Sequence, residues 1–195
     1  DSFFFKQVYF KKIDKLLKIL LDENYVLINS NLINRRKFYH PSIYNKASRA
    51  AEWHTDSRYL GGKRLGKGLS YIVYVALEDF SEENGGTCYI PKSHLTTKIP
   101  KRKANYKHEV LSLKRGDMII FDSGLWHKGG KSTNKSRWTI FNYYGPWWMK
   151  PYFSYDKMLG SKLKSLSVNL RKMLHCYSTP PKNSRIRANT LTKPE

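Results

Sequence analysis

The chain has 195 residues, the size of one ordinary domain, so it can bury a core without disulfide bonds. Hydrophobic residues make up 40% and aromatic residues 14%, which excludes a disordered chain, and no apolar run is long enough for a membrane span. Two cysteines, Cys88 and Cys176, are too few for a disulfide framework and suit a reducing compartment. We therefore expect a single cytoplasmic domain over residues 1–195. The first residues lack an initiator Met and a signal-peptide pattern, which fits a complete or an N-terminally truncated domain.

The strongest compositional anomaly is a formal net charge of +21, with a pI near 9.9. Such a charge favours contact with nucleic acid, anionic lipid or an acidic substrate. The lysines and arginines are spread along the whole chain, and no helix-turn-helix, zinc-finger or RNA-recognition signature accompanies them. The charge therefore does not predict a nucleic-acid partner by itself, and a basic nucleic-acid-binding module is kept only as an alternative.

The N-terminal segment predicts one amphipathic helix within residues 1–24. Its apolar residues recur at helical spacing with lysines between them: Val8, Tyr9, Ile13, Leu16, Leu17, Leu20 and Leu21. We expect this helix to cover a sheet.

Residues 25–150 show short apolar stretches separated by Gly, Pro, Asn and Ser, the pattern of a β-rich core. The expected strands are Tyr25–Ile28, Ala51–Asp56, Leu69–Leu77, Thr87–Ile90, Glu109–Leu113, Asp117–Phe121, Gly124–His127 and Arg137–Tyr144. Many short strands with helices only at the ends predict a mainly β fold, a double-sheet jelly roll or barrel.

The C-terminal segment, residues 151–195, predicts a second amphipathic helix and a tail. Leucines at 159, 163, 166, 170 and 174 follow a spacing of four and three residues. The tail from Ser178 has two adjacent prolines, several charges and few apolar residues, so we expect an extended surface segment.

His54 and Asp56 are two residues apart in an expected strand, so their side chains can point to the same face and bind one ion. A His-x-Asp pair alone is more often an ordinary hydrogen-bonded pair. Both residues stand at the end of a strand, however, where barrels bind ligands, and His127 ends another. Two histidines and one carboxylate leave three coordination positions open, as in non-haem Fe(II) oxygenases. His94 follows a turn and His108 lies in a lysine-rich loop, so neither is expected to bind the metal.

Arg137 opens an aromatic strand whose alternation places Arg137, Thr139, Phe141 and Tyr143 on one face. A buried guanidinium needs an anion, and its planar fork matches a carboxylate in bidentate geometry. We therefore expect an acidic cosubstrate at this face. The alternative is a surface arginine paired with Asp122 or with solvent.

Four sequence motifs together resemble the phytanoyl-CoA dioxygenase family of Fe(II)- and 2-oxoglutarate-dependent oxygenases, over roughly residues 51–148. They are Trp-His-Thr-Asp at 53–56, Ala-Leu-Glu-Asp-Phe-Ser-Glu-Glu-Asn-Gly-Gly-Thr at 76–87, Ile-Pro-Lys-Ser-His at 90–94 and Trp-His-Lys-Gly-Gly at 126–130, with an arginine beyond. The resemblance implies a double-stranded β-helix, a cupin-like jelly roll. It also implies that His54, Asp56 and His127 are catalytic metal ligands for Fe(II). Arg137 would hold the distal carboxylate of 2-oxoglutarate, and Tyr74 lies where family members can contact this cosubstrate.

The resemblance further implies a dioxygenase that uses O2, releases succinate and CO2 and hydroxylates a small organic molecule. Related halogenating enzymes lack the ligand carboxylate, so Asp56 favours hydroxylation over halogenation. This chain departs from the family in having Lys92 where a glycine is common, and in having only 53 residues before His54. A metal-binding jelly roll without catalysis is kept as an alternative.

The residues next to the expected mouth of the site are basic or aromatic: Trp53, Arg58, Tyr59, Lys63 and Arg64. They favour an anionic or aromatic small-molecule substrate, but they also fit a basic rim without specificity. The sequence indicates neither the substrate itself nor the oligomeric state.

Overall fold

The computed structural model describes residues 7–35, 51–57, 59–60, 63–64, 68–131 and 135–176, with only the backbone at 59–60 and 63–64. The expected tail from Ser178 lies outside these residues. Among the described helices, none is both long and apolar enough to cross a membrane. The single-domain boundaries and the cytoplasmic location stay predictions.

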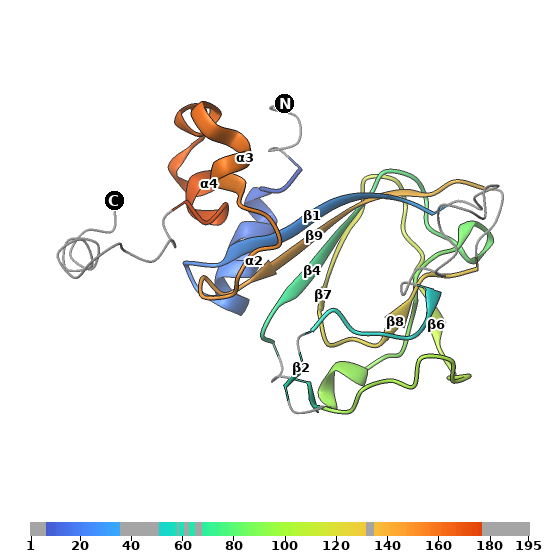
Figure 1. The fold of residues 1–195 in the computed structure, drawn as a ribbon. Helices are drawn as coiled ribbons and strands as arrows, with labels where there is room; N and C mark the ends of the chain where they lie inside the picture. The colour runs from blue at the N-terminus through green and yellow to red at the C-terminus, as the bar shows by residue number, and fades with distance from the viewer. Residues whose placement is uncertain are drawn as a thin grey trace, which may run out of the picture.

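Two antiparallel sheets form the body of the molecule (Figure 1). The larger sheet has the order β1-β9-β4-β7 and the smaller has the order β6-β5-β8. The larger sheet consists of β1 (Val26–Asn34), β9 (Trp138–Gly145), β4 (Tyr71–Ala76) and β7 (Met118–Asp122). The smaller consists of β6 (Glu109–Val110), β5 (Cys88–Tyr89) and β8 (His127–Lys128), and a separate pair joins β2 (Tyr59–Leu60) to β3 (Lys63–Arg64). The mainly β jelly-roll prediction is confirmed.

The helices gather at one end of the molecule, against the larger sheet (Figure 1). They are α2 (Lys11–Leu21), α3 (Tyr155–Leu159) and α4 (Val168–Met173), and the 3-10 turn η4 (Gly160–Ser165) lies between α3 and α4 in the chain. Two further 3-10 turns, η2 (Glu82–Asn84) and η3 (Ser93–Leu95), lie between strands. The N-terminal amphipathic helix is confirmed, although it begins at Lys11.

The larger sheet is buried on both faces, which explains why β4 reads as an almost uninterrupted apolar run. Val73 faces the helices, whereas its neighbours Ile72 and Tyr74 face the interior of the barrel. The same alternation places Tyr144 of β9 on the helix side and Tyr143 on the barrel side. Each strand therefore serves two cores.

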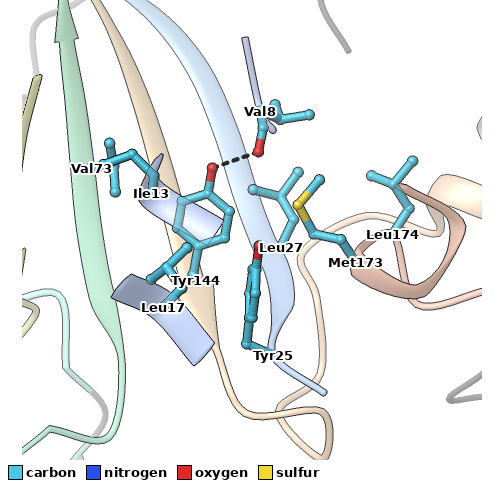
Figure 2. Close-up of a cluster of buried hydrophobic side chains, with 9 residues drawn as sticks. All are labelled: Val8, Ile13, Leu17, Tyr25, Leu27, Val73, Tyr144, Met173 and Leu174. Atoms are coloured by element: carbon cyan, nitrogen blue, oxygen red, sulfur yellow. Dashed lines mark hydrogen bonds between the residues drawn. The ribbon is translucent and has the colours of Figure 1, made fainter. Parts of the chain in front are cut away.

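Figure 2 shows the helix-side core, in which side chains of α2 and α4 meet the sheet. Its members are Val8, Ile13, Leu17, Tyr25, Leu27, Val73, Tyr144, Met173 and Leu174. The Tyr144 hydroxyl donates to the carbonyl oxygen of Val8 (2.7 Å), and the Tyr25 hydroxyl donates to Asp14 (2.8 Å). These bonds satisfy the polar ends of two large buried rings, as burial of tyrosine requires.

Two expected elements are wrong. The leucine-rich C-terminal segment is not one helix, because Gly160 adopts a left-handed backbone (φ +51°) after α3. A new helix, α4, starts after Ser167, whose hydroxyl accepts from the backbone N–H of Leu170 (3.3 Å). Ala51–Asp56 is not a strand either, because only His54 makes a bridge, and the N–H groups of Asp56 and Ser57 both turn toward the carbonyl of Ser123.

The remaining differences concern strand ends. β1 continues to Asn34, six residues beyond the expected end, because it pairs along its length with β9. β8 begins at His127, since Gly124 and Leu125 form a turn held by hydrogen bonds to Asp122.

Two glycine pairs pack against each other where the η2 turn meets the end of β8. A Cβ added at Gly130 would overlap the carbonyl oxygen of Gly86 and approach Gly85. A Cβ at Gly86 would lie 2.7 Å from the carbonyl oxygen of Ser81. The close approach of these backbones accounts for glycine at positions 85, 86 and 130.

Gly130→Ala should lower the free energy of unfolding by about 3 kcal/mol, because the rigid backbone around it cannot move aside. Gly116→Ala is the matched control: its Cβ meets nothing within 4 Å, although Gly116 has a φ of +93°. That strain alone costs about 1–2 kcal/mol. Urea unfolding measures both variants, and a loss at Gly130 no larger than at Gly116 would contradict the packing explanation.

Candidate metal and cosubstrate site

His54, Asp56 and His127 converge at the inner end of the barrel, although two sequence segments supply them. The backbone N–H groups of His54 and His127 donate to each other's carbonyl oxygens at 3.0 Å, which places the two imidazoles side by side with ring centroids 4.3 Å apart. Asp56 follows in the turn, with Oδ1 3.9 Å from Nε2 of His54 and Oδ2 3.4 Å from Nε2 of His127. One ligand atom from each residue lies within 4.8 Å of the others, a spacing that one metal ion can bridge.

Both histidines hold the tautomer that a metal ligand needs. Nδ1 of His54 lies 2.8 Å from the carbonyl oxygen of Glu52, and Nδ1 of His127 lies 2.9 Å from that of Leu125. A carbonyl only accepts, so each Nδ1 carries the proton and donates it. Each Nε2 then presents its lone pair toward Asp56, the arrangement that orients imidazole ligands in metal sites.

The charges of the three groups are coupled. Burial, reinforced by His127, lowers the pKa of His54. Burial would also lower the pKa of His127, but contact with Asp56 outweighs it and raises the pKa above its ordinary value. Burial would raise the pKa of Asp56, yet His127 and His54 bring it down. Oδ2 of Asp56 is buried without a hydrogen-bond partner among the described residues, so the donor set fits a divalent cation.

A chain of buried hydroxyls holds the turn that carries Asp56. Ser123 lies 2.9 Å from Ser57 and 2.6 Å from Ser70, oxygen to oxygen. Tyr143 lies 3.0 Å from Ser70 and donates to the carbonyl oxygen of Asp56 at 3.2 Å. These four side chains are at most 5% exposed, so their bonds fix the backbone beside Asp56. No sequence pattern indicated this cluster.

The three residues line one end of a cavity of about 270 Å³ between the two sheets. Its long wall is the inner face of β1 and β9, where alternate residues point inward. The lining residues are Asn29, Asn31, Ile33, Arg35, His54, Asp56, Tyr74, Thr87, His127, Gly129, Arg137, Thr139, Phe141, Tyr143 and Tyr152. The volume is near the lower end of small-molecule sites, which span roughly 300–1,000 Å³.

Arg137 lines this cavity and is 3% exposed, so the surface alternative is wrong. Its guanidinium lies 4.0 Å above the ring of Phe80, while Nε and Nη1 are buried without a hydrogen-bond partner among the described residues. Burial lowers the pKa of Arg137 to about 10. Asp122 accepts instead from the backbone N–H groups of Gly68 and Gly124, at 2.8 and 2.6 Å. A charged fork with free donors in a cavity is suited to a carboxylate.

Tyr74 lines the same cavity and also belongs to the barrel core. Its ring packs edge-to-face on Phe121, with centroids 5.1 Å apart, and burial raises the pKa of its hydroxyl. The position fits contact with a cosubstrate beside Arg137 as well as a packing role.

The expectation that Trp53 lies at the mouth of the site is wrong. Its side chain is 1% exposed and packs against Tyr106, His108 and Lys128. Arg58 lies outside the described residues, as do the side chains of Tyr59, Lys63 and Arg64. Neither His94 nor His108 joins a group of metal-ligating side chains in the described part of the chain.

Sequence reasoning missed the contribution of β1. Asn29, Asn31 and Arg35 alternate along the chain, and this pattern could have been recognised if the strand had been extended past Ile28. No comparable signal pointed to Tyr152, which reaches the cavity from the loop after β9.

Residues 3–139 match the family model for phytanoyl-CoA dioxygenase (PhyH). The chain belongs to the phytanoyl-CoA dioxygenase family. This match confirms the resemblance and covers each of the five candidate residues.

Two curated proteins with similar sequences are longer than this chain. An uncharacterized protein of Mycobacterium tuberculosis, Rv1501, is 28% identical over 93 residues, which are 47% of this chain and 34% of the relative. Dioxygenase hkm4 of Aspergillus hancockii is 25% identical over 136 residues, 66% of this chain and 45% of the relative. The chain thus spans less than half of these curated relatives.

Solved structures confirm the fold of this phytanoyl-CoA dioxygenase family member. The structure of HygX from Streptomyces hygroscopicus with nickel and 2-oxoglutarate bound has a TM-score of 0.59 at 16% identity, covering 80% of this chain and 72% of that one. At this identity the likeness establishes the jelly-roll fold alone.

Ser123→Ala should weaken divalent metal binding by about 10–100-fold, because side chains that position metal ligands typically contribute that much. It should also cost about 1–3 kcal/mol of stability, because two buried hydroxyls, those of Ser57 and Ser70, each lose their hydrogen bond to Ser123. Isothermal titration with Mn(II) measures the first effect and urea unfolding the second. Ser165→Ala, which removes an exposed hydroxyl, is the control. Unchanged metal affinity in Ser123→Ala would contradict the positioning role.

Metal affinity should fall as the pH is lowered, because protons compete with the ion for Nε2 of His127. The pKa of His127 is raised above 6.5, so proton competition begins at a higher pH than for an ordinary histidine. Below that pKa, affinity should drop by about tenfold per pH unit for each proton displaced. Mn(II) titrations from about pH 8 to pH 5 measure this. A constant affinity over that range would contradict ligation by His127.

Proposed function

We propose that this chain is a dioxygenase that depends on Fe(II) and 2-oxoglutarate and hydroxylates a small organic molecule. The observation behind this proposal is one cavity with two histidines and a carboxylate at one end and the guanidinium of Arg137 in its wall. Nε and Nη1 of that guanidinium have no hydrogen-bond partner among the described residues. The first group suits Fe(II), and the second suits the distal carboxylate of a keto acid. Membership of the phytanoyl-CoA dioxygenase family supports this assignment.

In the proposed reaction, Fe(II) would be held by His54, Asp56 and His127. When bound, Fe(II) with 2-oxoglutarate and O2 would supply the oxidising chemistry, in which one oxygen atom would enter succinate with loss of CO2 and the other would become the hydroxyl of the product. Asp56 keeps the carboxylate in the ligand set, so we favour hydroxylation over halogenation.

The chain's own residues would determine where the cosubstrate lies. Arg137, fixed on Phe80, would pair with the distal carboxylate, and Tyr74 beside it would limit the space along the keto acid. Phe141 and Tyr152 line the same cavity and supply apolar surface that can position a carbon skeleton and exclude water. The substrate itself is proposed only as a small organic molecule.

His127→Ala should abolish Fe(II)-dependent conversion of 2-oxoglutarate to succinate, because it removes a ligand that is 3% exposed and directly beside the other two. Succinate release by the purified, iron-reconstituted protein is the measurement, with bound iron quantified in parallel. His94→Ala, a histidine outside the group of metal-ligating side chains, is the control.

Wild-type protein that binds iron but yields no succinate would favour a non-catalytic metal-binding jelly roll. Activity that persists in iron-reconstituted His127→Ala would overturn the proposed site. Tight binding to DNA or RNA that falls with salt and ignores chelators would favour the nucleic-acid alternative.

A further inference from the structure

A second arginine, Arg35, lies directly opposite Arg137 on the same inner wall. Its backbone N–H donates to the carbonyl oxygen of Arg137 at 2.9 Å, one position beyond the Asn34–Trp138 pair of β1 and β9. Residues opposite each other in antiparallel strands point to the same face. Both side chains accordingly line the candidate cosubstrate cavity.

This juxtaposition is unfavourable without an anion. Like charges directly opposite each other in a sheet repel, and burial weakens the screening by water. No carboxylate in the described part of the chain forms an ion pair with either arginine. The Nε of Arg35 and the Nε and Nη1 of Arg137 are buried donors without a partner among the described residues.

Each guanidinium is nevertheless held in place. Nη2 of Arg35 donates to the carbonyl oxygen of Gly130 at 2.7 Å, and Arg137 is stacked on Phe80. The bond to Gly130 uses one of the five N–H donors of Arg35, so it does not account for the choice of arginine. Two fixed cations with unused donors are preorganised for an anion that lies between them.

We propose that Arg35 and Arg137 together bind one distal carboxylate, which makes the cavity selective for a dicarboxylic 2-oxo acid over a monocarboxylic one. Binding that carboxylate removes the repulsion between the arginines and satisfies their buried donors. The inference rests on the proposed function and deepens it, because it gives the cosubstrate site a second cation.

The test compares two ligands on the Mn(II)-loaded protein: 2-oxoglutarate and 2-oxopentanoate, which has a methyl group in place of the distal carboxylate. Calorimetric dissociation constants give the ratio of the two affinities. Arg35→Gln removes the charge but keeps an N–H donor for Gly130. This variant should bind 2-oxoglutarate about 10–100-fold more weakly, which corresponds to the loss of one charged hydrogen bond. Its affinity for 2-oxopentanoate should be nearly unchanged.

Two further variants serve as a comparison and as a control. Arg137→Gln should reduce the same ratio at least as strongly. Lys131→Gln, which removes an exposed cation from the neighbouring cavity, should leave the ratio at the wild-type value. Thermal melting of each metal-loaded variant reports whether it is folded.

If Arg35→Gln keeps the wild-type ratio of affinities for the two acids, or loses affinity for both equally, the shared carboxylate site is overturned. If Arg137→Gln lowers the ratio in that same experiment, the proposed function stands and only this inference fails. If the wild-type protein binds neither acid in the presence of the metal, both fail.

Discussion

The reciprocal pair of backbone hydrogen bonds between His54 and His127 is the constraint on which the site depends. It is the only ladder contact that the 53–56 segment makes within the described residues, and it joins that segment to the smaller sheet. Without it, His54 would lose its direct backbone link to His127, although the next turn would still be bonded to Ser123. Backbone pairing therefore positions the two histidines. The buried hydroxyls of Ser123 and Tyr143 add the bonds that hold the turn with Asp56.

The larger sheet supplies the other half of the site through its two-sided burial. Helices cover one face and bury residues such as Val73 and Tyr144, which leaves the opposite face free to carry polar groups into the barrel. A charged residue on that inner face lowers the free energy of unfolding by about 3–5 kcal/mol unless an anion compensates its charge. The buried charge of Arg137 therefore lowers the free energy of unfolding of the ligand-free protein. A cosubstrate that binds Arg137 should raise it again.

The sequence was sufficient to predict the fold class, and the five residues that it singled out line one cavity, because motif and alternation are local properties. Alternation along residues 137–144 predicted that Arg137 shares a face with Phe141, and both line the cavity in the structure. The helical spacing of the C-terminal leucines was misleading, since periodicity records where a face is apolar and not whether Gly160 and Ser167 interrupt the backbone. The strand expected at Ala51–Asp56 was wrong for a similar reason. The N–H group of Asp56 bonds to the carbonyl oxygen of Ser123, which is far away in the sequence. The hydroxyl cluster and Tyr152 could not be predicted, because they depend on contacts between distant segments.

The most direct test of the account is a crystal structure of the protein with Mn(II) and 2-oxoglutarate. The account predicts one ion coordinated by Nε2 of His54, a carboxylate oxygen of Asp56 and Nε2 of His127, with the distal carboxylate of the keto acid on the guanidinium of Arg137. An ion bound elsewhere, or a keto acid whose distal carboxylate lies away from Arg137, would contradict it.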